Sequence, residues 1–378
     1  MNAPTGSRHL DAEPPTDQRQ ALVSPADNDA SGQLIEAIQE AIRDRKPLAI
    51  YGGNNKAFYG RRTDSTPISA AGHTGILSYD PTELVLTARA GTSLALIESV
   101  LAEHLQVIPF EPPNFGPTAT LGGAIACGLS GPRRPFVGAT RDFVLGVTVL
   151  TGRGQRLRFG GQVMKNVAGY DIARLMTGSL GTLGVLLDIS VKVLPAPQTE
   201  ITLALERDTE TAIQTMNALA GRPLPLSAAC AYGGILYLRL SGTPSAITTA
   251  RETIGGTTVD GSSLWQGIRE HTHPFFAGPR PLWRLSVPSA TPVIDDLPGA
   301  LLIDWGGAQR WLRTDAKAPV IRKAVDRVGG HATFFRGHDG RDEVFHPLKT
   351  GLLRLHRRLK EAFDPQRILN PGRMYEEL

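Results

Sequence analysis

The segment from Glu111 to Pro195 decides the fold, and it reads EPPNFGPTATLGGAIACGLSGPRRPFVGATRDFVLGVTVLTGRGQRLRFGGQVMKNVAGYDIARLMTGSLGTLGVLLDISVKVLP. Glycine recurs throughout this segment, within an otherwise well-patterned apolar sequence, so it is not a flexible linker. Glycine adopts positive φ readily and lets the main chain approach a ligand closely. The segment therefore predicts a binding site built mainly from main-chain N–H groups, suited to a flat, polar, phosphorylated ligand.

A second glycine-rich turn lies upstream. A short apolar strand over 47–51 runs directly into Gly52, Gly53, Asn54 and Asn55. Glycine and asparagine tolerate backbone conformations in which the sign of φ alternates, and these point several N–H groups into one concavity. Such a concavity is a nest for anionic oxygens. Lys56, Arg61 and Arg62 add positive charge beside it. A tight turn with incidental polarity is the alternative, and the glycine-rich segment downstream favours the nest.

The flanking periodicity predicts the elements around these two turns. Helices are expected from Ser31 and over 94–101, 121–126 and 170–176, and strands over 84–89, 143–150, 155–159 and 185–194. Thr118 and Thr120 precede the helix at 121–126 and supply a hydroxyl cap. Small residues in its first turn would let a pyrophosphate lie against free N–H groups.

After residue 197 the pattern changes to strands and helices of ordinary spacing. The order strand, helix, strand, strand, helix over 200–206, 212–220, 226–231, 235–240 and 244–254 indicates a ferredoxin-like unit. A strand at 283–287, a hairpin around Gly306-Gly307, a helix at 319–328 and a strand at 333–336 follow, and no internal repeat is evident. A last amphipathic helix is expected to turn its apolar face inward and to leave its basic face in solvent. The apolar residues are Leu348, Leu352, Leu355, Leu359 and Phe363.

Length and composition fit a globular protein of two domains. The chain has 378 residues, and about 150 residues is an ordinary domain. We divide it into a disordered, proline-rich tail (1–30), a first domain (31–197), a second α+β domain (198–345), and a C-terminal helix and tail (346–378) that returns to the first domain. A formal net charge of +4 without an aromatic-studded basic stripe excludes a nucleic-acid partner.

The cysteine content limits the chemistry of the chain. Cys127 and Cys230 are the only cysteines, which excludes a disulfide framework and an iron–sulfur cluster held by this chain alone. No apolar run reaches the ~18 residues of a membrane span, and no signal peptide is evident. We expect a cytoplasmic protein, or one held at a membrane through partner subunits.

Several common motifs are missing. No Gly-x-Gly-x-x-Gly follows a strand, and P-loop, His-Glu-x-x-His and Gly-x-Ser-x-Gly motifs do not occur. His271 and His273 have the spacing of two metal ligands but no third ligand at a telling distance, so we interpret them as the end of a helix and expect no metal site. Cys127 is interpreted as a packing residue.

Four stretches in order carry a resemblance. They are Gly52 to Asn55 after a strand, PTATLGGAIA (117–126), RDFVLGV (141–147) and GSLGTLGV (178–185). Together they resemble the FAD-binding domain of the vanillyl-alcohol-oxidase/PCMH-type family. The stretches YGGNNKAFYGR (51–61), KNVAGYD (165–171) and FDPQRILNPGRMY (363–375) are similar, within it, to the FAD-binding subunits of glycolate oxidases. The resemblance implies an α+β fold, with a PCMH-type two-subdomain FAD-binding domain followed by a ferredoxin-like α+β cap domain.

The resemblance also implies which residues bind FAD. Gly52, Gly53, Asn54, Asn55 and Lys56 would wrap the pyrophosphate. The residues that would line the pyrophosphate and the flavin edge are Pro117, Thr118, Thr120, Gly122 and Gly123. Those that would offer main-chain groups to the flavin or adenine are Gly181, Thr182, Leu183, Gly184 and Val185. Asn370 and Arg373 are candidates at the cofactor, with a salt-bridged tail as the alternative.

Two departures from the family pattern matter. Relatives often place a histidine in the first glycine loop for covalent attachment, whereas this chain has Asn54, Asn55 and Lys56, so FAD is expected to be non-covalent. Related 2-hydroxy-acid dehydrogenases carry a His-x-Gly-Asp-Gly-Asn segment in the second domain, which the stretch 338–341 does not match. No carboxylate or histidine stands out as a catalytic base.

The resemblance implies the FAD subunit of a glycolate oxidase complex that oxidises glycolate to glyoxylate. Its expected partners are a second flavin subunit and an iron–sulfur subunit, because this chain cannot hold a cluster. Two alternatives stay open. One is a self-sufficient FAD-dependent oxidoreductase of another 2-hydroxy acid. The other is a non-catalytic structural or electron-relay subunit of such a complex.

Overall fold

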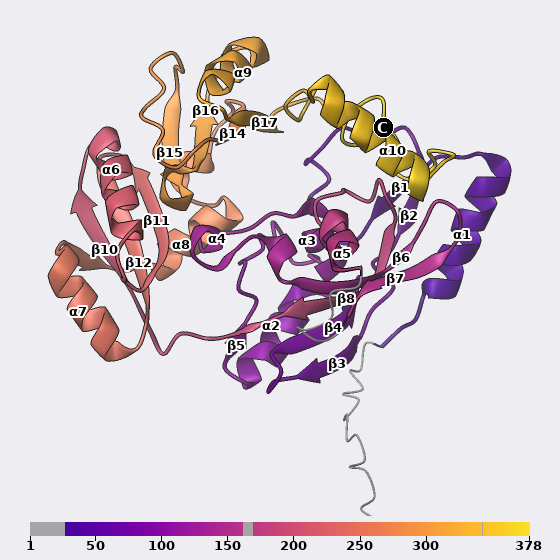
Figure 1. Cartoon of the computed structure of the whole chain (residues 1–378), viewed down its shortest axis with the longest axis horizontal. Coiled ribbons are helices and arrows are strands. Elements are labelled where there is room, and N and C mark those ends of the chain that lie inside the picture. The colour runs from indigo at the N-terminus through magenta and orange to yellow at the C-terminus, as the bar shows by residue number, and fades with distance from the viewer. Residues whose placement is uncertain (1–26, 162–168, 342) are drawn as a thin grey trace, which may run out of the picture.

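The computed structural model describes residues 27–161, 169–341 and 343–378, and these form two lobes (Figure 1). The first lobe contains residues up to Pro195 together with the C-terminal helix and tail. The second lobe begins at Thr199. The α+β class is confirmed, and in the view of Figure 1 the lobes lie side by side.

The smaller part of the first lobe is organised around a parallel strand pair. Helix α1 (Ser31–Asp44) precedes β1 (Leu48–Tyr51), which pairs with β2 (Thr66–Ser69). The apolar face of α1 is buried through Leu34 and Ile38, which belong to one cluster with Ile368 and Leu369 of the tail. The tail thus packs on the N-terminal strand, and Leu48 pairs with Leu369 in a parallel bridge.

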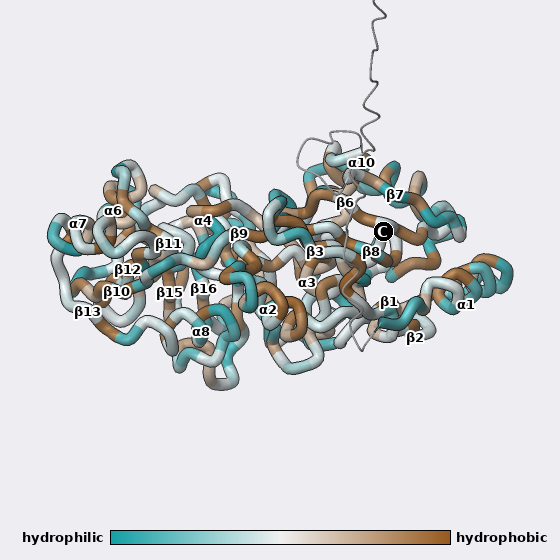
Figure 2. The backbone as a smooth tube through the Cα atoms, turned by 90° about the horizontal axis from the view of Figure 1, so that it is seen from below, coloured by the Kyte–Doolittle hydropathy of each residue, from teal (hydrophilic) through white to brown (hydrophobic). Residues whose placement is uncertain are grey.

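The larger part of the first lobe is a five-stranded antiparallel sheet. Its order is β3 (Ile76–Asp80), β4 (Val85–Arg89), β8 (Val185–Lys192), β6 (Val144–Leu150) and β7 (Arg156–Gly160). Helices α2 (Leu94–Glu103), α3 (Leu121–Cys127) and α5 (Tyr170–Met176) contribute buried residues to its core. In Figure 2 the tube of α2 is largely hydrophobic, in keeping with the buried Leu94, Ile97 and Leu101. Short elements complete the lobe: β5 (Gln106–Val107), which pairs with β9 (Leu194–Pro195), and α4 (Arg134–Val137).

The second lobe starts with the predicted ferredoxin-like unit. Its elements are β10 (Thr199–Glu206), α6 (Thr209–Ala220), β11 (Leu226–Tyr232), β12 (Ile235–Gly242), α7 (Pro244–Ile254) and β13 (Thr257–Val259). The sheet order is β13-β10-β12-β11, which is fourth, first, third, second in chain order. The prediction of this unit from the order of elements is confirmed.

A second set of four strands repeats this arrangement. The strands that follow in the sheet are β15 (Ala300–Asp304), β16 (Gln309–Arg313), β14 (Leu282–Ser286) and β17 (His331–Arg336). In chain order they are second, third, first and fourth, which is the order of the first set read from the opposite edge. Helix α9 (Ala318–Arg327) precedes β17, and α8 (Ser262–Glu270) links the two sets. The sets join through Ala231 and Ile303 into one eight-stranded sheet. The prediction that the chain has no internal repeat is therefore wrong for its topology.

The last helix, α10 (Thr350–Phe363), corrects a second prediction. Leu352 and Leu355 are 50% and 52% exposed, so this part of the apolar face does not point inward. Leu359 and Phe363 do pack on the core of the first lobe. Between them the fully buried Lys360 donates to Asp364 Oδ2 (2.8 Å), the Leu369 carbonyl (2.6 Å) and the Thr182 carbonyl (2.8 Å). The helix turns its lysine inward because three oxygens satisfy the ammonium there.

Parts of two other predictions fall outside the described residues. The predicted disordered tail over 1–30 lies outside them up to residue 26, and so do residues 165–168 of the KNVAGYD stretch. Asn28 pairs with Thr74, and Ala30 is buried, so the end of the predicted tail is packed against the first lobe. None of the helices in the described ranges has the length and hydrophobicity that crossing a bilayer requires.

Candidate cofactor site

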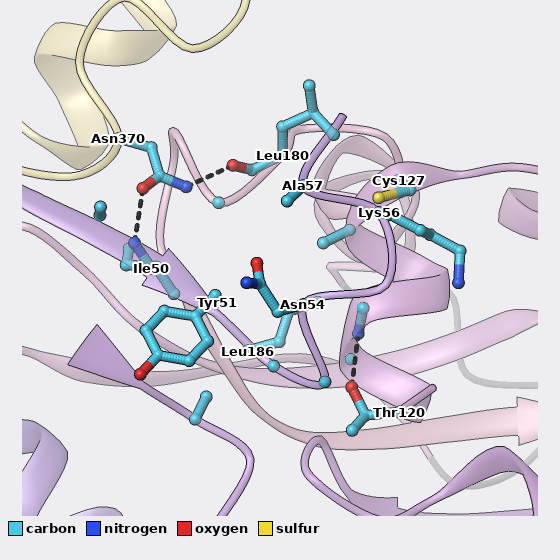
Figure 3. A pocket seen from close by; sticks show the side chains of 18 of the residues that line it. Ile50, Tyr51, Asn54, Lys56, Ala57, Thr120, Cys127, Leu180, Leu186 and Asn370 are labelled. Carbon is cyan, nitrogen blue, oxygen red and sulfur yellow. Dashed lines mark hydrogen bonds between the residues drawn. The ribbon is translucent and has the colours of Figure 1, made fainter. Parts of the chain in front are cut away.

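A cavity of about 680 Å³ opens in the first lobe beside the end of β1 (Figure 3). Most of its walls come from four segments that are far apart in the sequence: β1 and the turn after it, the start of α3, the loop before β8 with the start of that strand, and the C-terminal tail. Residues around β2 and Ala90 complete the lining. Its volume is within the usual 300–1,000 Å³ of small-molecule and cofactor sites. The predicted residues that line it are Gly52, Gly53, Asn54, Asn55, Lys56, Thr120, Gly122, Gly123, Gly181, Gly184, Val185, Asn370 and Arg373.

The turn from Gly52 to Lys56 supplies the main-chain donors of the cavity. No N–H group in this turn donates a hydrogen bond to any part of the chain that the structure describes. Asn54 has φ of 60°, the left-handed conformation that such nests contain. The turn is therefore open to an anionic ligand, as the sequence predicts.

Gly53 makes the closest main-chain approach in the site. A Cβ atom at Gly53 would lie 1.5 Å from the Thr118 carbonyl oxygen, which no side-chain adjustment relieves. The Thr118 hydroxyl donates to the Gly53 carbonyl (2.7 Å) and also contacts Asn55 Oδ1. Thr118 itself does not line the cavity, and neither does the exposed Pro117. Thr118 shapes the turn from outside the cavity.

The start of α3 differs from the prediction. Thr120 does cap the helix by accepting from the Gly123 N–H (3.2 Å). The Leu121 and Gly122 N–H groups, however, donate to the carbonyls of Thr92 (2.9 Å) and Ala90 (2.7 Å). The helix start thus has no free N–H groups for a pyrophosphate at these positions. Gly122 is needed instead for packing, because a Cβ there would lie 2.6 Å from the Ala90 Cβ.

The loop before β8 contributes only part of its predicted residues. Gly181, Gly184 and Val185 line the cavity. Thr182 does not, since its hydroxyl donates to the Ser179 carbonyl (2.7 Å) and its own carbonyl accepts from Lys360. Leu183 is buried in the sheet core.

Asn370 fastens the tail to two walls of the cavity. Its Oδ1 accepts from the Ile50 N–H (2.6 Å) and its Nδ2 donates to the Leu180 carbonyl (2.7 Å) (Figure 3). A Cβ at Gly181 would lie 2.8 Å from Asn370 Nδ2, so glycine makes room for this contact. Asn370 therefore holds β1 and the loop before β8 at a fixed spacing.

Arg373 orients the segment that follows the first turn. Its guanidinium donates to the carbonyls of Arg61 (2.7 Å), Tyr59 (2.8 Å) and Ala57 (3.0 Å). The sequence left a salt-bridged tail as the alternative role of Arg373. The partners of its guanidinium are carbonyl groups, so a salt bridge is not what holds this residue.

Positive charge collects at one end of the cavity. Lys56 is buried, and burial lowers the pKa of its ammonium. Burial likewise raises the pKa of the Cys127 thiol, against the opposing effect of the Lys56 and Arg373 charges. Cys127 lines the cavity beside Lys56 (Figure 3), so it is more than a packing residue.

His271 and His273 lie just after the end of α8. His271 is the residue that ends α8, and His273 Nδ1 accepts from the Phe275 N–H (3.2 Å). Within the described ranges, no three His, Cys, Asp or Glu side chains are grouped as metal ligands. The interpretation of these histidines as a helix end is confirmed.

Sequence reasoning missed some of the wall. The missed residues are mostly small, and one of them, Pro67, lies on β2, which was not predicted: Ala49, Ile50, Tyr51, Ala57, Thr63, Pro67, Ala70, Ala90, Ala119, Ala126, Cys127, Leu180 and Leu186. Alanine carries no functional group that would mark it. Only the strand–turn position of Tyr51, directly before the glycines, was a usable signal.

The chemistry of the wall fits a phosphorylated cofactor. A nest of unbonded N–H groups beside a buried lysine suits a diphosphate. The alanine and glycine walls leave flat space for rings. Since a Cβ at Gly53 would collide with the main chain, the nest depends on glycine, which is the property expected of a phosphate-binding turn.

Comparison with protein families agrees with this fit. The family described as FAD binding domain matches residues 20–160. The family described as FAD linked oxidases, C-terminal domain, matches residues 337–374.

Individual relatives extend the similarity along the chain. The chain is 49% identical to the glycolate oxidase subunit GlcE of Escherichia coli strain K12, over 93% of this chain and 99% of that protein. It is 32% identical to the glycolate oxidase subunit GlcD of Bacillus subtilis strain 168, over 54% of this chain and 44% of that protein. A solved alkyldihydroxyacetonephosphate synthase superposes with a TM-score of 0.65 at 15% identity, covering 92% of this chain and 76% of that one, which shows a shared fold.

Proposed function

Because the chain belongs to the family of the glycolate oxidase subunit GlcE, we propose that it is the FAD-binding subunit of a complex that oxidises glycolate to glyoxylate. The observation that carries the proposal is the cavity, with its unbonded N–H groups at Gly52 to Lys56 and the buried Lys56. Its position in the part of the chain that matches the FAD binding domain supports FAD as the cofactor.

The chain's own residues divide the work of holding the cofactor. The N–H groups from Gly52 to Lys56 bind the diphosphate, and Lys56 balances its charge. Asn370 keeps the two walls apart, and Arg373 holds the segment after the turn in place. Bound FAD would accept the hydride, which carries two electrons, from the α-carbon of the substrate.

Attachment of the cofactor is proposed to be non-covalent. No histidine stands in the turn, where Asn54, Asn55 and Lys56 occupy the positions after the two glycines. Burial keeps the Cys127 thiol protonated by raising its pKa, which disfavours it as a nucleophile.

The partners follow from what the chain lacks. Two electrons must leave the flavin, and two cysteines cannot hold an iron–sulfur cluster. We therefore propose a second flavin subunit, resembling the GlcD relatives, and an iron–sulfur subunit. Through them a cytoplasmic assembly can reach a membrane.

The test is the visible absorption spectrum of the purified chain, followed by addition of glycolate without oxygen. A flavin spectrum that bleaches supports both the cofactor and turnover on this chain. A flavin spectrum that bleaches only when the partner subunits are added supports the electron-relay role within the complex. A colourless chain that does not take up added FAD contradicts the proposal.

A further inference from the structure

Tyr51 is the aromatic member of the wall of the cofactor cavity. Among the described residues that line this cavity, no other has an aromatic ring. Its side chain is 38% exposed and lies at the end of β1, directly before the glycine turn. In the part of the chain that the structure describes, the side chain meets no other ring, no cation and no hydrogen-bond partner. The wall therefore presents a ring that the fold itself does not stack.

An equally exposed tyrosine elsewhere does have ring partners. Tyr232 in the second lobe is also 38% exposed, and its ring meets those of His273 (5.4 Å between centroids) and Phe275 (5.5 Å). Stacking of a nucleobase on an aromatic side chain needs an accessible ring face, because every base has a π face of its own. Tyr51 offers such a face inside a cavity.

Small apolar residues extend the surface beside Tyr51. In the parallel pair of β1 and β2, Ala49 pairs with Pro67 and Tyr51 pairs with Ser69. Side chains two residues apart in a strand lie on the same face. Ala49, Pro67 and Tyr51 therefore share one face of the pair, and all three line the cavity. A planar base has an apolar surface to lie against at this end.

The position of Tyr51 relative to the phosphate turn indicates which half of the cofactor it meets. Asn54 lies between Tyr51 and Lys56 in the view of Figure 3, so these two residues flank the turn that is proposed to bind the diphosphate. The Lys56 ammonium donates to the Asn114 carbonyl (3.4 Å), and the Asn114 N–H donates to Glu270 Oε2 of α8 (3.0 Å). Lys56 thus marks the end next to the second lobe, and Tyr51 marks the other end.

The two ends suit different halves of FAD. Sites that enclose a small molecule lie preferentially where two domains meet. The flavin ring, which must meet the substrate in the proposed function, is therefore expected at the Lys56 end, next to the second lobe. Because the diphosphate of FAD stands between the flavin half and the adenosine half, the adenosine then extends toward Tyr51.

From this arrangement we infer that Tyr51 stacks on the adenine ring and makes the cavity selective for an adenine dinucleotide over a flavin mononucleotide. The inference rests on the proposed function and deepens it, because it names the residue that recognises the half of FAD that takes no part in the reaction. The glycine turn holds the diphosphate whichever ring follows it, so selectivity for adenine needs a separate group.

The test is calorimetric titration of the full chain, after removal of its flavin, with FAD, ADP, FMN and inorganic pyrophosphate. We expect Tyr51→Ala to weaken the binding of FAD and ADP by about tenfold, because the stacking is lost. FMN and pyrophosphate, which have no adenine, are expected to bind the variant as they bind wild type. Tyr51→Phe keeps the ring and is expected to restore the wild-type affinity for FAD and ADP.

The matched control is Tyr232→Ala, which removes an equally exposed tyrosine ring from the second lobe and leaves all four affinities unchanged. Thermal unfolding is followed for every variant without ligand. Tyr51→Leu is measured beside Tyr51→Ala, because leucine keeps apolar bulk at the end of β1 and offers no π face. It is expected to weaken ADP while the unfolding temperature stays at the wild-type value.

Several outcomes would overturn the inference. Weaker FAD binding with unchanged ADP binding would place the flavin ring at Tyr51. Equal losses for ADP and pyrophosphate would mean that Tyr51 only shapes the turn. No saturable binding of ADP by the wild-type chain would also contradict it.

Failure of the inference and failure of the proposed function are distinguishable. A chain that binds ADP through Tyr51 but never takes up FAD contradicts only the proposed function. A chain that takes up FAD with the same affinity in wild type and in folded Tyr51→Ala contradicts only this inference.

Discussion

At the scale of single residues, Gly53 is the position on which the cofactor site depends most. A Cβ atom at this position would collide with the Thr118 carbonyl of the main chain, which cannot move aside as a flexible side chain could. We expect Gly53→Ala to weaken FAD binding at least tenfold, because the turn must shift and its N–H groups then point elsewhere. Fluorescence titration with FAD measures the affinity of the variant and of the wild type.

The matched control for this prediction is Gly32→Ala. Gly32 lies in α1, and nothing is within 4 Å of a Cβ built on it. This change is expected to leave FAD affinity unchanged and to stabilise the helix by about 0.5–1 kcal/mol. Equal FAD affinity in Gly53→Ala and wild type would show that the turn is not the diphosphate site.

Asp304 gives a prediction of pH dependence. Complete burial raises the pKa of this carboxyl to about 7, against the usual ~3.9 in an unfolded chain. Below about pH 4 the Asp304 carboxyl is protonated in both the folded and the unfolded chain, and its contribution to the free energy of unfolding is fully present. Between about pH 4 and 7 the unfolded chain releases the proton and the folded chain keeps it, so stability falls as pH rises, by up to about 1.4 kcal/mol per pH unit.

Urea unfolding of wild type and Asp304→Asn at pH 5 and 6.5 measures this contribution. The variant is expected to lose less stability between the two pH values than wild type. Asp295→Asn, an exposed change in the same lobe, should follow wild type. Parallel curves for wild type and Asp304→Asn would show that Asp304 is already ionised in the folded protein.

Whether the role of a residue could be predicted depended on where its hydrogen-bond partner lies in the sequence. The donors of the 52–56 turn could be predicted because the turn's own residue types determine them. The free N–H groups expected at the start of α3 could not be judged, because their acceptors on Ala90 and Thr92 lie about thirty residues upstream. Asn370 was placed at the cofactor through resemblance alone, and its hydrogen bond to Ile50 spans 320 positions.

At the scale of elements, α10 shows a buried lysine supporting the loop beside the cavity. We expect Lys360→Met to destabilise the protein by about 3–5 kcal/mol, because Asp364 stays buried without its partner. The Thr182 and Leu369 carbonyls also lose their donor. Chemical unfolding measures the loss.

Leu352→Gln on the exposed part of the same helix is the control, and a change within about 0.5 kcal/mol is expected there. If the two substitutions had equal effects, the inward lysine would not be what anchors the helix.

The apolar periodicity correctly predicted that α10 is a helix. It failed to predict which face is inward, because the oxygens that accept from Lys360 include one from a loop far away in sequence.

At the scale of the whole molecule, a few charged groups tie the lobes together. Glu111 accepts from Arg239 of the second lobe (2.7 Å), and Arg239 is 4% exposed. Glu270 of α8 accepts from the Phe115 N–H of the first lobe (2.8 Å). Aromatic rings also meet between the lobes, where Phe335 of the second lobe contacts Phe58 and Phe115 of the first, with ring centroids 5.4 and 6.4 Å apart.

We expect Glu111→Gln to uncouple the lobes, because Arg239 loses its 2.7 Å carboxylate partner on the first lobe and keeps only Glu200 of its own lobe, at 3.7 Å. Scanning calorimetry should resolve two unfolding transitions in the variant where wild type shows one. Glu252→Gln on the exposed α7 is the control and keeps the wild-type profile. A single unshifted transition in Glu111→Gln would mean that the aromatic contacts alone couple the lobes.

The arrangement of the whole molecule was predictable in part. The order of elements after Pro197 indicated the first ferredoxin-like unit. The second unit lacks the helix between its first two strands, where a loop over 287–299 stands instead, so its pattern did not repeat along the sequence.

The hydrogen bond between Ile50 and Asn370 has a consequence for the order of events during synthesis. Ribosomes add roughly 5–20 residues per second, so the 320 positions between the two residues correspond to roughly 15–60 s. During that interval the nascent chain already carries the glycine turn but lacks the strap that closes the wall. We therefore expect cofactor loading to wait until the tail has left the ribosome, and prematurely terminated chains to be released colourless.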